Sequence, residues 1–266
     1  MEVIIIEPHC FCAGVNNALT MAYKAKKEHP NETIHILGSL VHNEIVVKDL
    51  EKDGFVILNE KKKTLEEWIE TLHNGQIIVF SAHGHDPRLD LLAKNKGLIV
   101  YDSTCGFVKA NELLLKKKVE TGGQVIYIGQ KGHAEAMGAL GIDPNNIFLC
   151  EPGKPFDYSK VTSENPLLVS QTTMGLDEIK LVISELKERY PKLEIAARAC
   201  DATEKRQNAI STAPSDTDLY VIMGSSTSNN TIKLFELAKA QYQNAEVIRV
   251  LDVEELKTLK IKGKKK

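Results

Sequence analysis

The chain has 266 residues, of which 42% are apolar and 26% are charged, and its formal net charge at pH 7 is −2. This composition is typical of a soluble globular chain with a full hydrophobic core. Because there is no overall basic field, nucleic acid is not an expected partner. No segment approaches the roughly 18 consecutive apolar residues of a membrane span, and no leader peptide precedes the first apolar run. We therefore expect a cytoplasmic protein without a membrane partner.

Short runs rich in valine, isoleucine and leucine predict strands that are buried on both faces. In chain order these runs cover residues 3–6, 77–80, 98–101, 125–128, 167–169 and 219–223. Between them, apolar residues recur at helical spacing and predict amphipathic helices. Those on one such face are Leu65, Trp68, Ile69 and Leu72, behind a capping box of Thr64 and Glu67, and those on another are Ile179, Val182, Ile183, Leu186 and Tyr190. Alternation of strands and helices predicts an α/β fold with small, mostly parallel sheets.

Three cysteines mark an internal repeat. Cys12, Cys105 and Cys200 are separated by 93 and 95 residues, and each follows a predicted strand and precedes a predicted helix. A second predicted strand ends 26, 24 and 24 residues further on, at Gly38, Gly129 and Gly224. We therefore expect a trefoil of three pseudo-repeated α/β lobes at residues 1–97, 98–193 and 194–266.

The third copy of this repeat is shorter than the other two. Ser81 and Ser170, which follow a further predicted strand, lie 69 and 65 residues after their cysteines. The equivalent serine of the third copy would fall at about residues 265–269, and the sequence given ends at Lys266. The repeat thus predicts that the third lobe lacks its C-terminal strand and loop in this sequence.

The spacing of the cysteines favours a metal over a disulfide framework. The chain has five cysteines, an odd number, and it is too long to need disulfides for stability. In open parallel sheets, ligands gather beyond the carboxyl ends of the strands, so lobes packed around a threefold axis would bring Cys12, Cys105 and Cys200 together. Three thiolates can hold three irons of one [4Fe–4S] cluster and leave the fourth iron open. We interpret Cys150 as a buried apolar residue, and Cys10, which we expect to lie with Cys12 in an extended strand, as a bystander.

Polar residues gather at the same strand ends and predict a site for a small anion. Imidazoles, hydroxyls, amides and helix N-termini can bind a phosphate or diphosphate without arginine. The residues concerned are His42, His83, His133, Glu135, Thr172, Thr173, Ser228 and Asn230. Glu135 follows His133 by two residues, so in an extended loop both side chains can enter one cavity, where the carboxyl could move protons. Glu135 could equally well favour the N-terminus of a helix that starts near Ala136.

Eight short motifs, in order and over nearly the whole chain, resemble those of the LytB/IspH family of 4-hydroxy-3-methylbut-2-enyl diphosphate reductases. The matching segments are Phe11-Cys12-Ala13-Gly14-Val15, Val41-His42-Asn43, Phe80-Ser81-Ala82-His83-Gly84, Asp102-Ser103-Thr104-Cys105, Gly132-His133-Ala134-Glu135, Ser170-Gln171-Thr172-Thr173, Cys200-Asp201-Ala202-Thr203 with Arg206-Gln207, and Gly224-Ser225 with Ser228-Asn229-Asn230. The sequence departs from the family pattern at Gly106, where proline is usual, and at Asn229, where serine is usual. An amide at Asn229 still donates a hydrogen bond, so binding need not be lost.

The resemblance implies a [4Fe–4S] cluster, one per chain, held by Cys12, Cys105 and Cys200. It further implies that a small allylic diphosphate is reductively dehydroxylated to isopentenyl and dimethylallyl diphosphate, the last step of the non-mevalonate isoprenoid pathway. An electron donor such as ferredoxin or flavodoxin would be the partner. By the same resemblance, Glu135 delivers protons and Thr172 helps to hold the hydroxyl end of the substrate. The residues implied to contact the diphosphate are His42, His83, His133, Ser228, Asn229 and Asn230.

Three other functions remain open at this stage. A cluster-dependent hydro-lyase would use the open iron only as a Lewis acid and would need no external reductant. A non-catalytic Fe–S protein is suggested by the short third repeat, and it would bind diphosphates weakly. A metal-free thiol enzyme would use Cys12 as a nucleophile at a helix start, and it would be colourless but active.

Overall fold

The computed structural model describes residues 2–58 and 62–259. The chain divides into two compact units. The larger unit consists of Phe11–Thr172 and Asp177–Arg198, and the smaller unit consists of Met1–Cys10, Thr173–Leu176 and Ala199–Lys266. Within the described residues, the helices are all too short or too polar to span a lipid bilayer.

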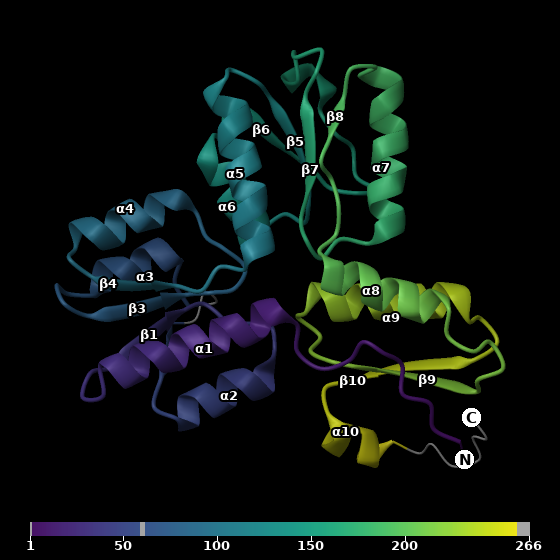
Figure 1. Cartoon of the computed structure of the whole chain (residues 1–266), viewed down its shortest axis with the longest axis horizontal. Helices are drawn as coiled ribbons and strands as arrows, with labels where there is room; N and C mark the ends of the chain where they lie inside the picture. The colour runs from purple at the N-terminus through teal and green to yellow at the C-terminus, as the bar shows by residue number, and fades with distance from the viewer. Residues whose placement is uncertain (1, 59–61, 260–266) are drawn as a thin grey trace. The chain divides into compact units, whose positions relative to one another are not determined.

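The first sheet of the larger unit has the strand order β2-β1-β3-β4, and all its neighbouring strands are parallel. Helices cover both faces (Figure 1). Alanines of α1 and apolar residues of α2 pack on one face, and α3 and α4 pack on the other. The elements are α1 (Ala13–Glu28), β1 (Ile34–Leu37), α2 (Glu44–Lys52), β2 (Val56–Leu58), α3 (Leu65–Thr71), β3 (Ile77–Phe80), α4 (Pro87–Asn95) and β4 (Ile99–Asp102).

The second sheet of the larger unit repeats this plan with the parallel order β6-β5-β7-β8. Helices α5 and α6 lie on one side of it and α7 on the other (Figure 1). The elements are α5 (Gly106–Glu120), β5 (Val125–Ile128), α6 (Ala134–Ile142), β6 (Ile147–Cys150), the 3₁₀ turn η1 (Tyr158–Lys160), β7 (Leu167–Ser170), α7 (Leu176–Arg189) and β8 (Glu194–Ile195).

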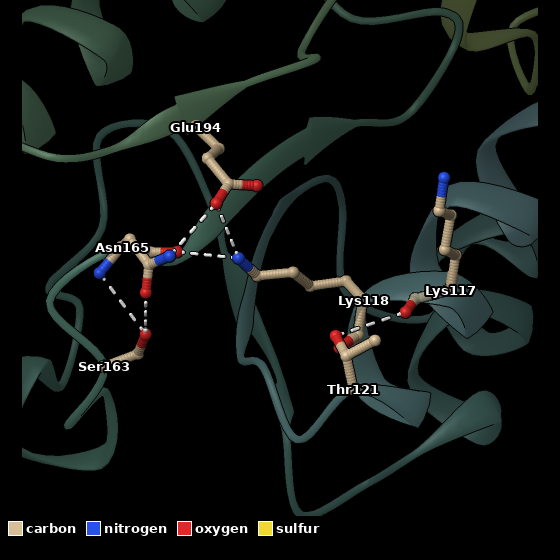
Figure 2. Close-up of polar contacts among 6 residues, drawn as sticks. All are labelled: Lys117, Lys118, Thr121, Ser163, Asn165 and Glu194. Atoms are coloured by element: carbon tan, nitrogen blue, oxygen red, sulfur yellow. Dashed lines mark hydrogen bonds and ion pairs between the residues drawn. The ribbon is translucent and has the colours of Figure 1, made fainter.

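A polar junction ties the end of α5 to the edge of this second sheet. Lys118 Nζ donates to the carbonyl of Asn165 and to Glu194 Oε1, both at 2.9 Å, and the amide of Asn165 donates to the same carboxylate at 3.1 Å (Figure 2). The Lys118 side chain is only 12% exposed, so this ion pair is less screened by solvent than an ordinary surface pair. The junction fixes α5, whose first residue follows Cys105, against β8.

The smaller unit contains a third parallel sheet, in which the described residues form two strands, β9 and β10. Helices α8 and α9 pack on it through Ile210, Ala238 and a stacked pair of tyrosines, Tyr220 and Tyr242, whose ring centroids lie 4.1 Å apart. The elements are α8 (Asp201–Ser211), β9 (Leu219–Met223), α9 (Asn229–Gln241), β10 (Glu246–Val250) and α10 (Val253–Thr258).

Most of the expected elements are confirmed. The capping box at Thr64 is present, with the Glu67 N–H donating to Thr64 Oγ1 at 3.2 Å and the Thr64 N–H donating back to Glu67 Oε2 at 2.7 Å. Strands β3, β5 and β9 have the expected bounds, whereas β4 starts one residue later than expected. Strands β1, β5 and β9 end one residue before Gly38, Gly129 and Gly224, as the repeat requires.

Two expectations about strands are wrong. Residues 3–6 form no strand, and Val3 and Ile5 are 71% and 70% exposed, because this segment has no hydrogen-bonded strand partner among the described residues. Strand β9 is not buried on both faces, since Val221 and Met223 are exposed on the side away from α8 and α9. The serine that the repeat would place in this lobe falls at about residues 265–269, outside the described residues.

Candidate active site

Three histidines meet at the carboxyl ends of β1, β3 and β5 in the larger unit. His42 lies in the turn before α2, His83 follows β3, and His133 is the N-cap residue of α6. The rings of His42 and His83 are stacked with centroids 4.0 Å apart, and His133 lies edge-on to them at 5.6 and 5.7 Å. The structure therefore brings together three residues that are 41 and 50 positions apart in the sequence.

All three imidazoles are held neutral. Burial lowers the pKa of His42, lowers that of His133 to about 4, and lowers that of His83 well below its ordinary value. Each neighbouring imidazole would repel a second positive charge, which adds to the shifts of His83 and His133. An anion placed among the three rings would offset both effects and favour their protonation.

The hydrogen bonds of His133 indicate which ligand the three histidines suit. The Glu135 backbone N–H donates to His133 Nδ1 at 3.2 Å, so the proton of the neutral ring is assigned to Nε2. The Nε2 atoms of His83 and His133 are buried and have no hydrogen-bond partner. Nitrogen atoms of the three rings lie within 4.8 Å of one another, close enough to be drawn onto a metal ion. However, a ring that carries its proton on the inward nitrogen donates to an anion and does not ligate a cation.

Glu135 lies in the first turn of α6 and is only 4% exposed. Its carboxylate accepts from the Thr172 backbone N–H at 2.9 Å, from Thr172 Oγ1 at 2.9 Å and from the Tyr127 hydroxyl at 3.1 Å. Burial raises its pKa to about 7, although these hydrogen bonds act in the opposite direction. A carboxyl with this pKa is half protonated near neutral pH, which suits a proton donor.

Both sequence-based interpretations of Glu135 are partly right. It does stand in the first turn of a helix, where a negative charge is favoured, and it is not in an extended loop as one interpretation required. Its side chain nevertheless points into the protein and accepts a hydrogen bond from Thr172, two residues after the end of β7. Tyr127 was missed from the sequence, although a tyrosine within an otherwise aliphatic strand is a signal that its hydroxyl needs a buried partner.

Each of the three periodic cysteines is the N-cap residue of a helix, Cys12 of α1, Cys105 of α5 and Cys200 of α8. The positive end of a helix dipole favours an anionic thiolate at this position. In the larger unit, a Cβ atom added to Gly14 would lie 2.8 Å from Cys105 Sγ and 3.7 Å from Cys12 Sγ, so both thiols border the same glycine. Cys200 belongs to the smaller unit, where its thiol donates to Thr203 Oγ1 at 3.2 Å.

The other two cysteines differ in environment. Cys150 is 6% exposed at the end of β6, as expected of a buried apolar residue, and burial raises the pKa of its thiol to about 11, which disfavours the thiolate. Cys10 is exposed and has a positive φ of 67°, so it lies in a bend. The expectation of an extended strand at Cys10 and Cys12 is therefore wrong, because the chain turns at this point.

The remaining predicted residues cluster at the start of α9 in the smaller unit. Ser228 is the N-cap residue, and its hydroxyl accepts from the Thr231 N–H at 3.4 Å. The side-chain amide of Asn229 donates to the carbonyl and to the hydroxyl of Thr173 at 2.8 and 3.0 Å. The side-chain oxygens of Asn229 and Asn230 are buried without a hydrogen-bond partner. The N-terminus of α9 is suited to an anion, because the first backbone N–H groups of a helix have no partner within the helix.

Small parallel sheets, with histidines and a buried carboxyl at strand ends and with cysteines at three helix starts, define an α/β protein. The chain belongs to the LytB protein family, whose model matches residues 3–266. It is 36% identical over 243 residues to the 4-hydroxy-3-methylbut-2-enyl diphosphate reductase of Malacoplasma penetrans, which covers 89% of this chain and 81% of that protein. It is 34% identical over 264 residues to the reductase of the same name from Lysinibacillus sphaericus, at 99% and 80% coverage.

Solved structures agree with these sequence relatives. The fold is similar to that of the E-1-hydroxy-2-methyl-but-2-enyl-4-diphosphate reductase from Plasmodium falciparum, with a TM-score of 0.85 and 29% identity, covering 97% of this chain and 79% of the other. It is also similar to a structure of (E)-4-hydroxy-3-methyl-but-2-enyl diphosphate reductase, the terminal enzyme of the non-mevalonate pathway, with a TM-score of 0.67, 25% identity and 99% and 90% coverage. The expected family and α/β fold class are thereby confirmed.

Proposed function

We propose that this chain reduces (E)-4-hydroxy-3-methylbut-2-enyl diphosphate to isopentenyl and dimethylallyl diphosphate, the reaction named for its relatives. In that reaction the allylic C–O bond breaks, two electrons and two protons are consumed, and water leaves. The observation that carries the proposal is Glu135, a buried carboxyl with a pKa of about 7 that Thr172 orients from the next strand end. This is the group that protonation of a leaving hydroxyl requires.

The cofactor would be a [4Fe–4S] cluster held by Cys12, Cys105 and Cys200. Three observations support the fit. All three thiols cap helices, two of them border Gly14, and a side chain at Gly14 would fill the space between them. When bound, such a cluster supplies electrons and a Lewis-acidic iron for the substrate hydroxyl. The proposed arrangement is a trefoil of three lobes, residues 1–97, 98–193 and 194–266, around this cluster.

The diphosphate would be bound by His42, His83 and His133 from the larger unit. The inward Nε2 atoms of two buried rings, those of His83 and His133, lack partners, and each unsatisfied buried group costs about 1–3 kcal/mol. Phosphate oxygens would accept these hydrogen bonds, and the negative charge would favour protonated imidazoles. Ser228, Asn229 and Asn230 at the start of α9 would supply further contacts.

Glu135 would hold the proton that leaves with the hydroxyl group. Thr172 keeps one carboxylate oxygen in place through its hydroxyl, and Tyr127 holds the other from within the core. With 4% exposure, the carboxyl exchanges its proton in a site from which water is largely excluded. Thr172, whose hydroxyl donates to this carboxyl, would help to hold the hydroxyl end of the substrate.

The electron donor would be a small redox protein such as ferredoxin or flavodoxin, and the compartment would be the cytoplasm. The chain spans 80 to 84% of the length of the curated relatives that it matches.

Anaerobic purification followed by titration with the allylic hydroxy-diphosphate tests the proposal. We expect the Mössbauer spectrum to change at one unique iron, and product to form only when an external reductant is added. Product formation without a reductant would instead establish a hydro-lyase. A normal cluster spectrum that does not change when substrate is added would establish a non-catalytic Fe–S protein. A colourless but active protein would establish thiol chemistry.

A further inference from the structure

Helix α6 presents two different faces to its surroundings. Ala136 and Ala139 pack on the second sheet, in the cluster that contains Val125 and Tyr127. Glu135, Gly138 and Gly141 follow each other at intervals of three residues and lie on another side of the helix. Two glycines in a helix of nine residues are unfavourable, because glycine is the least helix-favouring residue apart from proline. A specific contact is therefore needed to explain them.

The glycines allow the segment between β3 and α4 to approach the helix backbone closely. A Cβ atom at Gly138 would lie 2.9 Å from the carbonyl oxygen of His85 and 3.2 Å from its carbon. At Gly141 it would lie 2.5 Å from Asp86 Cγ and 2.7 Å from both carboxylate oxygens. Any side chain at either position would force the helix and residues 85–86 apart, since non-bonded carbon contacts lie near 3.5–4.0 Å.

Residues 85 and 86 are not free to move aside. The His85 ring is stacked on Phe80 with centroids 3.5 Å apart, and its Nε2 is 2.9 Å from Asp90 Oδ1. Asp86 is the N-cap residue of α4 and accepts from the Arg88 backbone N–H at 2.9 Å. The contact with α6 is thus made by a segment that is anchored at both of its residues.

This contact lies between two of the candidate site histidines. His83 precedes His85 by two residues, and His133 caps the same helix that carries Gly138. The structural connection between the two rings therefore has three parts. Residues 83–85 lead from His83 to the contact between His85 and Gly138, and about a turn and a half of α6 leads from Gly138 back to His133. Their ring centroids lie 5.7 Å apart, and both unpartnered Nε2 atoms belong to this pair.

We propose that Gly138 and Gly141 are positioning residues that set the separation of His83 and His133, and so the affinity of the site for a diphosphate group. The inference rests on the proposed diphosphate site. The glycines touch no ligand themselves. They act by letting α6 and residues 85–86 approach each other to the distance at which both inward Nε2 atoms reach one anion.

The test uses the cluster-loaded full chain, inorganic pyrophosphate as the probe, and a rescue pair. In G141A the added methyl group meets the Asp86 side chain, so D86G should remove the clash, and glycine is accepted at a helix N-cap. In G138A the methyl group meets backbone, so D86G should not help. We expect G141A to bind pyrophosphate about tenfold more weakly, as misplacement of binding groups predicts. D86G/G141A should bind as D86G does, and the exposed control M137A should bind as the wild type does.

Ring nitrogen resonances of ¹⁵N-histidine report on His83 and His133 without any ligand, so they separate this inference from the proposed function. We expect them to shift in G141A and to return in D86G/G141A. If the wild type does not bind pyrophosphate but the resonances shift in G141A and return in D86G/G141A, the diphosphate site is overturned and the glycine contact is not. Wild-type resonances and affinity in G141A, or a loss that D86G does not restore, would overturn the glycine contact. If G141A does not fold, recovery of a folded, pyrophosphate-binding protein in D86G/G141A supports it, and continued failure to fold contradicts it.

Discussion

Thr172 binds both oxygens of the Glu135 carboxylate, its backbone N–H reaching Oε1 and its hydroxyl reaching Oε2, each at 2.9 Å. The two residues come from different elements, Glu135 from the first turn of α6 and Thr172 from the residues after β7. This double contact fixes the plane of a carboxyl that is otherwise surrounded by protein. It also limits how far burial can raise the pKa, because hydrogen bonds to the charged form favour it.

Replacement of Glu135 by glutamine should abolish the proton donor while keeping the shape of the site. We expect turnover to fall by about 10²- to 10⁴-fold, the usual contribution of general acid catalysis. Pyrophosphate affinity and iron content should be unchanged. Single-turnover kinetics with a pre-reduced enzyme measures this effect, with E164Q, at an exposed position, as the control. Turnover in E135Q close to that of the wild type would rule out Glu135 as the acid.

The Thr172 hydroxyl should tune the pH profile of the reaction. T172V removes one hydrogen bond to the charged carboxylate and leaves the backbone N–H in place, so the pKa of Glu135 should rise above about 7. The acid must be protonated to act, so the alkaline limb of the kcat profile should move to higher pH. T172S, which keeps the hydroxyl, should leave that limb where it is in the wild type. A profile that is identical in T172V and wild type would show that the hydroxyl does not act on Glu135.

The buried carboxyl should also make stability depend on pH. Its pKa is about 7 in the folded protein, against an ordinary value of 4.5, so the folded state holds the proton more tightly. Its favourable contribution is therefore complete below pH 4.5 and is lost as the pH rises through 7. Relative to the wild type, E135Q should gain roughly 3 kcal/mol in unfolding free energy over this range. Denaturant unfolding of both proteins at several pH values measures the difference, and parallel curves would contradict it.

Much of this site follows from sequence because the repeat places equivalent residues at equivalent strand ends. Cys12, Cys105 and Cys200 all cap helices, as the common spacing predicts, and His42, His83 and His133 meet at one edge of the larger unit. Local patterns fix such features, since strand ends and helix starts depend on residues close in the chain.

Features that depend on a distant partner could not be predicted in this way. Residues 3–6 have the composition of a strand, but a strand exists only when another backbone pairs with it. The role of Tyr127 depends on Glu135 lying over its strand, and that of Gly138 depends on a segment 53 residues away. Sequence periodicity reports on which face is apolar and not on what covers it.

Diphosphate binding should be accompanied by proton uptake. In the empty site the pKa of His133 is about 4, and an anion in contact with the ring raises it. Because the complex then holds protons more tightly than the free protein, affinity should fall as the pH rises through the pKa of the bound state. Calorimetric titration of pyrophosphate in two buffers of different ionisation enthalpy measures the uptake. H133N should take up fewer protons, and equal uptake by both proteins would place the titrating group elsewhere.

The space around Gly14 should be needed for the cofactor. A methyl group there would lie 2.8 Å from Cys105 Sγ, so G14A should push the thiols of Cys12 and Cys105 out of position, and the protein should retain little iron and sulfide after anaerobic reconstitution. Gly106 provides a matched control next to the same cysteine, since its added Cβ would meet nothing within 4 Å and G106A should load normally. C12S, C105S and C200S should each lose iron, whereas C150S should keep it, because Cys150 is buried at the end of β6. Full iron content in G14A together with a loss in G106A would show that the close approach at Gly14 is not part of the cluster site.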